Sequence, residues 1–349
     1  MDVISLARGA PAPELLPLEE LADCAAAVLA REGKTILTYG SGAGYAPLRA
    51  LIGEWFGVHP GRVVLTNGSL QALDLLARRA RSQTVLVEYP TYDRAYKVLL
   101  GSGVSLVTGT VDADGLDPAS VDAVLAAERK PAFIYTIPTF QNPTGTSMTL
   151  ARRQRLAAFA ARRDIMLVED DPYRLVRFDG EPVPALFDLS GKETVYMSSF
   201  SKTIAPGLRV GWVIAPERLA DELADAAGDT YITPVQLGQA IAYEFIARGS
   251  FAPNLERVNA QLKARRDAML AALEKRFAGA RWTRPEGGYF VWLELPLGTD
   301  ARELLARAEG VAAVAGTEFT ATANFVRLAY SFAAPDEIEE GVARLAAAA

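Results

Sequence analysis

The stretch that decides the fold is residues 197–212, Met-Ser-Ser-Phe-Ser-Lys-Thr-Ile-Ala-Pro-Gly-Leu-Arg-Val-Gly-Trp. It holds one lysine, Lys202, behind three serines, and short apolar runs lead into it and out of it. A lysine in this setting is expected on a turn or strand end inside the fold, not on a solvated helix face. Arg209 follows, flanked by Gly207 and Gly211. A fixed guanidinium lowers the pKa of a nearby amine, which suits a lysine that forms a Schiff base. The alternative is a surface lysine and arginine on a Gly/Pro loop.

This stretch resembles the cofactor-lysine segment of fold-type-I pyridoxal-phosphate enzymes, the class I and II aminotransferases. The family pattern is Ser-x-x-Lys followed by a Gly-x-Arg-x-Gly-like run, and Ser199 to Lys202 and Gly207 to Gly211 match it. Penicillin-recognising acylases share the Ser-x-x-Lys spacing, but they also need a Ser-Asp-Asn and a Lys-Thr-Gly motif. The sequence contains neither motif, so we set that reading aside.

Length, charge and cysteine count limit the possible classes of function. The 349 residues suffice for one large or two ordinary domains, and a net charge of −6 argues against a nucleic-acid partner. A single cysteine excludes an intrachain disulfide and favours a cytoplasmic protein, and with one histidine it leaves too few ligands for a structural zinc site. We find no signal peptide and no run of about 18 apolar residues, so no membrane partner is expected. We interpret two arginine groups as solvated helix faces: Arg78, Arg79 and Arg81, and Arg152, Arg153 and Arg155.

Hydrophobic periodicity predicts an α/β protein. Residues 1–17 read as an extended arm that gains order by lying on another part of the chain. Helices are expected over 18–32, with Leu29 on the apolar face, and over 48–56, with Trp55 inward. From residue 63 strands and helices alternate, among them a helix over 117–128, which predicts a mainly parallel sheet covered by helices on both faces.

A long helix over 254–277 is expected to lead into a smaller α+β domain with strands at 288–295 and 324–331. We therefore expect three parts. They are an N-terminal arm and helix at a domain or dimer interface (1–45), a large cofactor-binding domain (46–255) and a C-terminal small domain (256–349).

In residues 165–173, three carboxylates and a tyrosine follow an apolar strand, at the end where open α/β sheets bind ligands. A carboxylate there can keep a pyridine nitrogen protonated, which makes the ring an electron sink. The family pattern Asp-x-x-Tyr fits Asp170 and Tyr173; Glu169 and Asp171 are alternatives if the strand register differs by one residue. A simple acidic cap on the next turn is the other possibility.

The segment Asn67-Gly68-Ser69-Leu70 joins a strand to a helix, whose free N–H groups and positive dipole end favour a phosphate. An ordinary serine cap would leave the same pattern. The family usually has a polar residue at the position of Leu70, so one side-chain contact is expected to be missing here.

The resemblance also implies roles for four further residues. Tyr92 matches the aromatic residue that stacks on the cofactor ring, and Asn142, in PTFQNPTG, matches the asparagine that binds its phenolic oxygen. Tyr39 matches a tyrosine that reaches the cofactor phosphate of a partner subunit. Arg327 matches the arginine that binds the substrate α-carboxylate; a domain-bridging ion pair is its alternative.

Together these matches identify the chain as similar to the aminoadipate/kynurenine-type aminotransferases, which also supply the catalytic half of some transcription regulators. Because the sequence begins directly with the arm, we expect a free enzyme. The resemblance implies a homodimer with pyridoxal 5'-phosphate on Lys202 as a Schiff base, moving an amino group from an L-amino acid to a 2-oxo acid. It implies phosphate contacts from Ser69, Ser199 and Arg209.

Two other functions stay open on the sequence alone. A lyase, decarboxylase or oxidase on the same scaffold would need nearly the same residues. A non-catalytic binding or regulatory protein could keep the fold, although the intact Lys202 and Asp170 argue against it.

Overall fold

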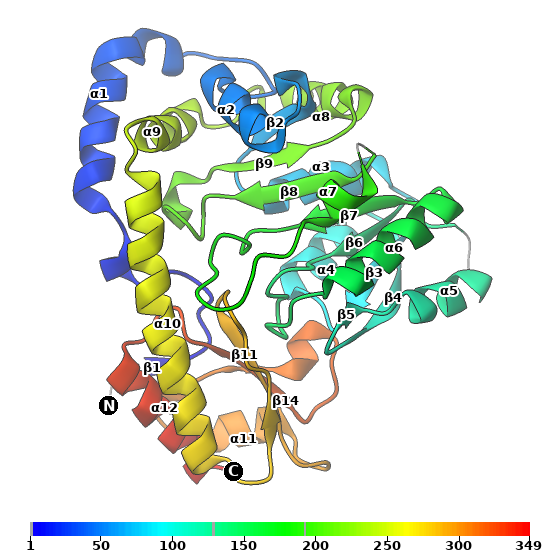
Figure 1. Cartoon of the computed structure of the whole chain (residues 1–349), viewed down its shortest axis with the longest axis vertical. Helices are drawn as coiled ribbons and strands as arrows, with labels where there is room; N and C mark the ends of the chain where they lie inside the picture. Colours follow the sequence, from blue (N-terminus) through cyan, green and yellow to red (C-terminus); the bar gives the residue numbers. More distant parts are fainter. Residues whose placement is uncertain (1–2, 128–129, 192) are drawn as a thin grey trace.

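The computed structural model describes residues 3–127, 130–191 and 193–349. A central sheet of eight strands carries helices on both faces (Figure 1). Its strands, in spatial order, are β2 (Val63–Thr66), β9 (Gly211–Ile214), β8 (Val195–Ser199), β7 (Met166–Asp170), β6 (Phe133–Thr136), β3 (Thr84–Tyr89), β4 (Ser105–Asp112) and β5 (Gly115–Leu116).

The sheet is mainly parallel, as predicted. The strands β4, β3, β6, β7 and β8 run parallel to one another. The strand β9 is antiparallel to both β2 and β8, and β5 is antiparallel to β4. Strands β2, β6, β8 and β9 are buried along their whole length, because helices exclude water from both faces.

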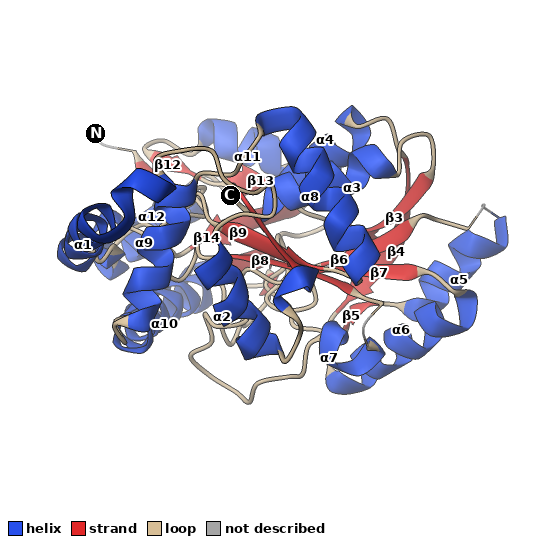
Figure 2. Cartoon of the chain, turned by 90° about the horizontal axis from the view of Figure 1, so that it is seen from above, coloured by secondary structure: helices blue, strands red, loops and turns tan. Residues whose placement is uncertain are grey.

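The helices divide between the two faces of the sheet (Figure 2). One face carries α3 (Ser69–Arg79), α4 (Asp93–Gly101) and α8 (Glu217–Tyr231). The other face carries α2 (Ala46–Phe56), α5 (Pro118–Ala127), α6 (Leu150–Arg163) and α7 (Leu186–Ser190). This confirms the predicted layers; Glu128, where the sequence places the end of α5, lies outside the described residues.

A smaller antiparallel sheet forms the second part of the fold. Its order is β10 (Arg281–Trp282), β11 (Phe290–Glu294), β14 (Phe325–Ala329) and β13 (Val314–Ala315), and α11 (Ala301–Arg307) and α12 (Pro335–Ala347) pack with it. The arm lies here: β1 (Ile4–Ser5) pairs with β12 (Val311–Ala312), and Ala12 N donates to Ser331 O at 3.1 Å. Met1 and Asp2, which the sequence assigns to the arm, lie outside the described residues.

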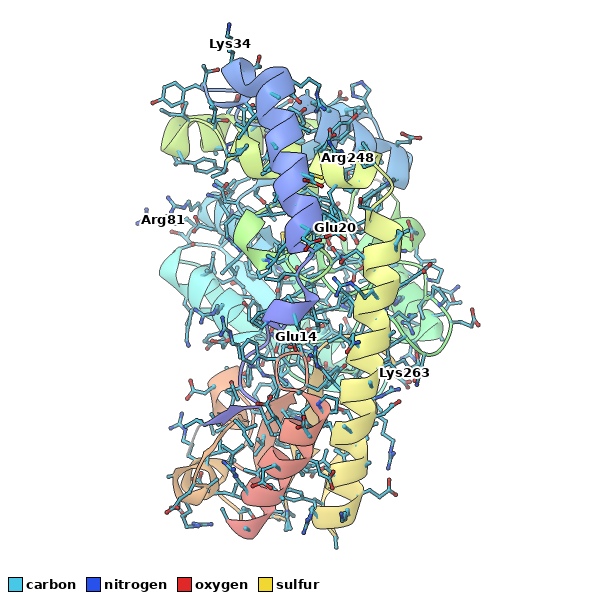
Figure 3. All side chains as sticks on the ribbon, turned by 90° about the vertical axis from the view of Figure 1, so that its left-hand side faces the viewer. Glu14, Glu20, Lys34, Arg81, Arg248 and Lys263 are labelled. Atoms are coloured by element: carbon cyan, nitrogen blue, oxygen red, sulfur yellow. The ribbon has the colours of Figure 1, made fainter. Side chains whose placement is uncertain are left out.

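The helix α10 (Phe251–Arg276) runs beside both sheets, with α12 along one half of it (Figure 3). The helix α1 (Leu18–Ile36) packs on α9 (Gln236–Ala247). Short 3-10 turns complete the fold at η1 (Pro13–Leu15), η2 (Pro60–Arg62), η3 (Pro206–Leu208) and η4 (Gly316–Phe319). None of the helices that the structure describes is long and apolar enough to cross a membrane.

Two predicted core residues are instead at the surface: Leu29 is 42% exposed and Trp55 is 40% exposed. Two predicted surface arginines, Arg152 and Arg153, are buried. The guanidinium of Arg153 donates hydrogen bonds to the carbonyl oxygens of Met148, Pro138 and Pro184 at 2.8–3.0 Å. It therefore connects these loops and is not solvated. The prediction for those two residues was wrong, because a helical charge pattern does not reveal carbonyl groups supplied by distant loops.

Candidate active site

One cavity of about 590 Å³ lies where the carboxyl ends of the parallel strands meet the start of α3 and the edge of the small sheet. Every predicted site residue except Tyr39 lines it: Gly68, Ser69, Leu70, Tyr92, Asn142, Asp170, Tyr173, Ser199, Lys202, Arg209 and Arg327. Tyr39 is 79% exposed and lies outside the cavity. Residues spread over most of the sequence are thus brought together by the topology.

Lys202 follows β8 in the turn that connects it to β9, and it is partly buried. Its Nζ donates to Gly9 O of the arm at 2.8 Å and lies 5.7 and 5.0 Å from the ring centres of Tyr173 and Tyr289. Burial lowers the pKa of this amine to about 8, with smaller contributions from Arg327 and then Arg209. The predicted direction is right, but burial outweighs the guanidinium named from the sequence, and a surface position for Lys202 is excluded.

Asp170 ends β7 with its carboxylate buried. Its Oδ2 accepts a hydrogen bond from Tyr135 Oη at 2.7 Å, and its Oδ1 has no partner among the described residues. Burial raises the pKa of Asp170 to about 7, against the opposing effect of the Tyr135 hydrogen bond. A buried oxygen without a partner is costly, so this one is suited to a ligand N–H group.

The neighbouring carboxylates do not line this cavity. Glu169 accepts hydrogen bonds from the backbone N–H groups of Leu186 and Phe187, and Asp171 accepts one from Tyr196 Oη at 3.2 Å. The strand register therefore selects Asp170 from the three candidates.

The backbone at the start of α3 is open to close contact with the strand β9 and with a ligand. Gly68 precedes the helix at φ 95°, and the helix has no side-chain cap to occupy its first N–H groups. A Cβ on Gly211 would lie 2.5 Å from Ser69 N, so glycine there lets β9 pass directly beside the helix start. Arg209, exposed in this chain, is held by a 2.7 Å hydrogen bond from Nη2 to Asn67 O. Free N–H groups beside a guanidinium form an anion site.

Arg327 is buried on β14 without an ion pair to any described residue. Its Nη1 donates to Asn142 Oδ1 at 3.0 Å, its Nη2 donates to Ala7 O at 2.8 Å, and its Nε has no partner among the described residues. Its guanidinium lies 4.3 and 4.7 Å from the ring centres of Phe290 and Phe319, and burial lowers its pKa to about 10. The alternative of a domain-bridging ion pair is therefore wrong, and the cavity holds a buried cation that lacks an anion.

Tyr92 lies directly before α4, and burial raises the pKa of its hydroxyl to about 12. Sequence reasoning missed Tyr135, although a hydroxyl on the strand beside β7 was a usable signal. It also missed a group that lines the side of the cavity near the arm and the small sheet: Arg8, Val314, Glu318 and Phe319.

These residues fit pyridoxal phosphate. The unpartnered Asp170 Oδ1 suits a ring N–H, Lys202 Nζ suits an aldehyde carbon, and the α3 start with Arg209 suits a phosphate.

Comparison with known proteins agrees with this site. The family model for aminotransferase class I and II matches residues 1–345. A 2-aminoadipate transaminase from Thermus thermophilus is 41% identical, with 98% of this chain and 89% of that protein covered. Among solved structures, a Thermus thermophilus alpha-aminoadipate aminotransferase complexed with N-(5'-phosphopyridoxyl)-L-leucine superimposes with a TM-score of 0.94 at 39% identity, covering 99% of this chain and 92% of that one.

A kynurenine aminotransferase from Pyrococcus horikoshii superimposes with a TM-score of 0.95 at 34% identity, covering 100% and 91% of the two chains. On these matches the chain belongs to the class I and II aminotransferase family, and it is a pyridoxal-phosphate-dependent aminotransferase of fold type I.

Proposed function

We propose that the cavity transaminates L-amino acids that carry a second carboxylate, such as 2-aminoadipate or glutamate, with a 2-oxo acid as amino acceptor. The observation that carries the transamination of an amino acid is the cation Arg327, which has no ion pair with a described residue and lies in the same cavity as Lys202 and Asp170, where it can bind the substrate α-carboxylate. A buried guanidinium without a carboxylate is stabilised when the substrate supplies one, and its fork matches a carboxylate in two hydrogen bonds.

The bound pyridoxal phosphate supplies a carbonyl carbon for amino groups and a ring that accepts electrons from the substrate Cα. Lys202 Nζ takes the proton from Cα and returns one, a task suited to an amine with a pKa of about 8. Asp170 Oδ1 would accept a hydrogen bond from the ring N–H of the cofactor, while Tyr135 fixes the orientation of that carboxylate. Asn142 connects the cofactor part of the site with the substrate-binding arginine, because its Oδ1 accepts a hydrogen bond from Arg327 Nη1.

Further contacts complete the proposed site. Gly68, Ser69, Leu70, Ser199 and Arg209 would hold the phosphate of the cofactor, together with Tyr39 of a partner subunit. Tyr92 would stack on the cofactor ring, and Asn142 and Tyr173 would bind its phenolic oxygen.

The side-chain preference rests on two arginines, Arg8 and Arg94, that line the cavity. Neither forms an ion pair with a described residue, and Arg8 lies 4.5 Å from the ring centre of Phe332. Two acidic residues, Asp93 and Glu318, also line the cavity, but Asp93 is engaged by Lys97 at 3.3 Å and Glu318 by Arg302 at 2.9 Å. The uncompensated charge is positive, which favours a substrate with an anionic side chain. The match to a 2-aminoadipate transaminase supports the same class.

Two further features belong to the proposal. Tyr39 is exposed and lies outside the cavity of its own chain, as expected if it contacts the active site of the partner subunit in a homodimer. The single, buried cysteine is compatible with a cytoplasmic enzyme. The boundaries of the three parts, after residues 45 and 255, also remain predictions.

The substrate class is tested with two amino acids of equal chain length, 2-aminoadipate and norleucine. We expect kcat/KM to favour 2-aminoadipate in the wild type, and Arg8→Gln or Arg94→Gln to lower it by about tenfold or more for 2-aminoadipate alone, because a charged hydrogen bond is lost. Arg81→Gln, an exposed arginine away from the cavity, is the matched control. Equal losses for both substrates, or no loss in either variant, would refute the anionic side-chain pocket while leaving transamination intact.

A further inference from the structure

A second cavity of about 600 Å³ lies behind the active-site cavity. Successive residues of an extended chain face opposite sides of a sheet, and Asp170 and Asp171 divide between the two cavities in this way. Asp170 lines the active-site cavity and Asp171 lines the second one, while Ser198 lines only the second. Pro172 and Ser199 line both cavities and so form a shared wall. The second cavity lies on the side of the sheet that carries α2 and α7 (Figure 2).

Aromatic rings form much of this second cavity. Trp55 and Phe251 stack with their ring centres 5.8 Å apart, and Tyr196 and Trp212 lie on the strands behind them. Trp55 leaves two-fifths of its surface in solvent although its position in α2 predicts a core residue. An exposed aromatic at the mouth of a cavity provides a flat wall for a planar ligand.

Three buried polar atoms of this cavity's residues have no hydrogen-bond partner among the described residues: Asp171 Oδ1, Thr203 Oγ1 and Trp212 Nε1. Their residues are only 2%, 4% and 4% exposed. Buried polar groups are rarely left without partners, and three around one cavity indicate that something polar belongs there. The other oxygen of Asp171 is already engaged by Tyr196 Oη at 3.2 Å, so Oδ1 is the remaining acceptor.

The charges around the cavity favour a cation. Asp171 and Asp188 both line it, and Arg174 is the one basic residue among the described residues of the lining. Arg174 Nε is 3.9 Å from Asp171 Oδ2 and its Nη2 is 3.6 Å from Asp188 Oδ2, so one guanidinium is shared between two carboxylates. A cationic N–H donor at Asp171 Oδ1 would complete this group.

We propose that this second cavity is a binding site for a planar aromatic cation, which stacks against Trp55 and donates hydrogen bonds to Asp171. The site is separate from the transamination chemistry and does not depend on the substrate class. Because Asp171 is bonded to Asp170 and Ser199 faces both cavities, its ligand lies one residue from the active site.

Calorimetric titration of the cofactor-loaded protein with benzamidine tests this proposal. An amidinium pairs with a carboxylate through two N–H groups, and benzamide is its neutral counterpart of the same shape. We expect one saturable benzamidine site per chain, and binding of benzamide weaker by about tenfold or more. No saturable binding, or equal binding of the two compounds, would overturn the proposal.

Two variants locate the site. Asp171→Asn removes the charge, and Trp55→Ala removes an aromatic wall that is 40% exposed. Each is expected to weaken benzamidine binding by about tenfold. Leu100→Ala, which truncates an exposed apolar residue on the opposite face of the sheet, is the matched control and should bind as the wild type does. If Asp171→Asn fails to fold, Trp55→Ala decides alone. Unchanged binding in Trp55→Ala would place benzamidine elsewhere and overturn the proposal.

Discussion

Asp170 is a carboxyl group that the fold buries with only one hydrogen bond. Its pKa is about 7 in the folded protein, whereas an exposed aspartate ionises near pH 4. The folded protein therefore holds a proton that the unfolded chain has lost across this window, and its free energy of unfolding falls as the pH rises through it. The fold tolerates this cost because the same unpartnered oxygen is available to the cofactor.

We predict that Asp170→Asn stabilises the cofactor-free protein at about pH 8 by roughly 1–4 kcal/mol. Most of this gain should disappear near pH 4, where Asp170 is protonated in the folded chain and about half protonated in the unfolded chain. Tyr135 can still donate to the asparagine oxygen. Urea unfolding of both proteins at the two pH values measures the difference. A gain that is independent of pH would contradict the assigned cause.

The sequence predicted the motif residues that line the cavity, because motifs fix residue types at strand ends, but it missed Arg8, Val314, Glu318 and Phe319, which lie outside the motifs. It could not predict Tyr135 as the partner of Asp170, since that hydrogen bond depends on how β6 and β7 align. Nor could it separate the buried Arg153 from the exposed Arg155 on one helix. Both failures concern contacts between segments distant in sequence.

At the scale of elements, the alternation of strands and helices predicted the main sheet, but not the reversed direction of β9. A short connection is possible only between antiparallel strands, and residues 200–210 make such a connection from β8 to β9. Phe200 N donates to Val210 O at 3.0 Å across its base, which holds the turn that carries Lys202. The reversed strand thus positions the lysine against the arm and the start of α3.

A substitution at Gly211 tests whether cofactor binding requires β9 to lie this close to the start of α3. A methyl group there would lie 2.5 Å from the Gly68 carbonyl carbon and from Ser69 N, so backbone must move. We predict that Gly211→Ala weakens binding of pyridoxal phosphate to the cofactor-free protein by about tenfold to hundredfold, because the anion site is displaced.

Fluorescence titration measures that affinity. Gly228→Ala on α8, where a Cβ meets nothing within 4 Å, is the control and should bind as the wild type does. Unchanged affinity in Gly211→Ala would show that the phosphate does not lie at this helix start.

At the scale of the whole molecule, the arm and the small sheet close one side of the cavity, and the large sheet supplies the other. The sequence predicted both parts, but the arm's contacts with Lys202 and Arg327 became visible only in the structure, because an aperiodic segment carries no signal for where it lies. Tyr39 is the one predicted site residue that a single chain does not place in the cavity.

Subunit complementation tests whether Tyr39 acts on a partner. We predict that Tyr39→Ala and Lys202→Ala proteins, each impaired alone, recover activity when mixed under conditions that exchange subunits. A mixed dimer contains one site with Lys202 from one chain and Tyr39 from the other. If Tyr39 served its own chain, no intact site would form and activity would not return.

We propose that Lys202 carries an amino-group transfer that runs in both directions. The most direct test is the visible absorbance of the cofactor-loaded protein during addition of 2-aminoadipate and then of a 2-oxo acid, for wild type and Lys202→Ala. We expect the wild-type band to be lost with the amino acid and restored by the 2-oxo acid, and we expect Lys202→Ala not to complete this cycle. Loss of the band without restoration, or release of carbon dioxide or ammonia, would contradict transamination; an unimpaired cycle in Lys202→Ala would contradict the role of the lysine.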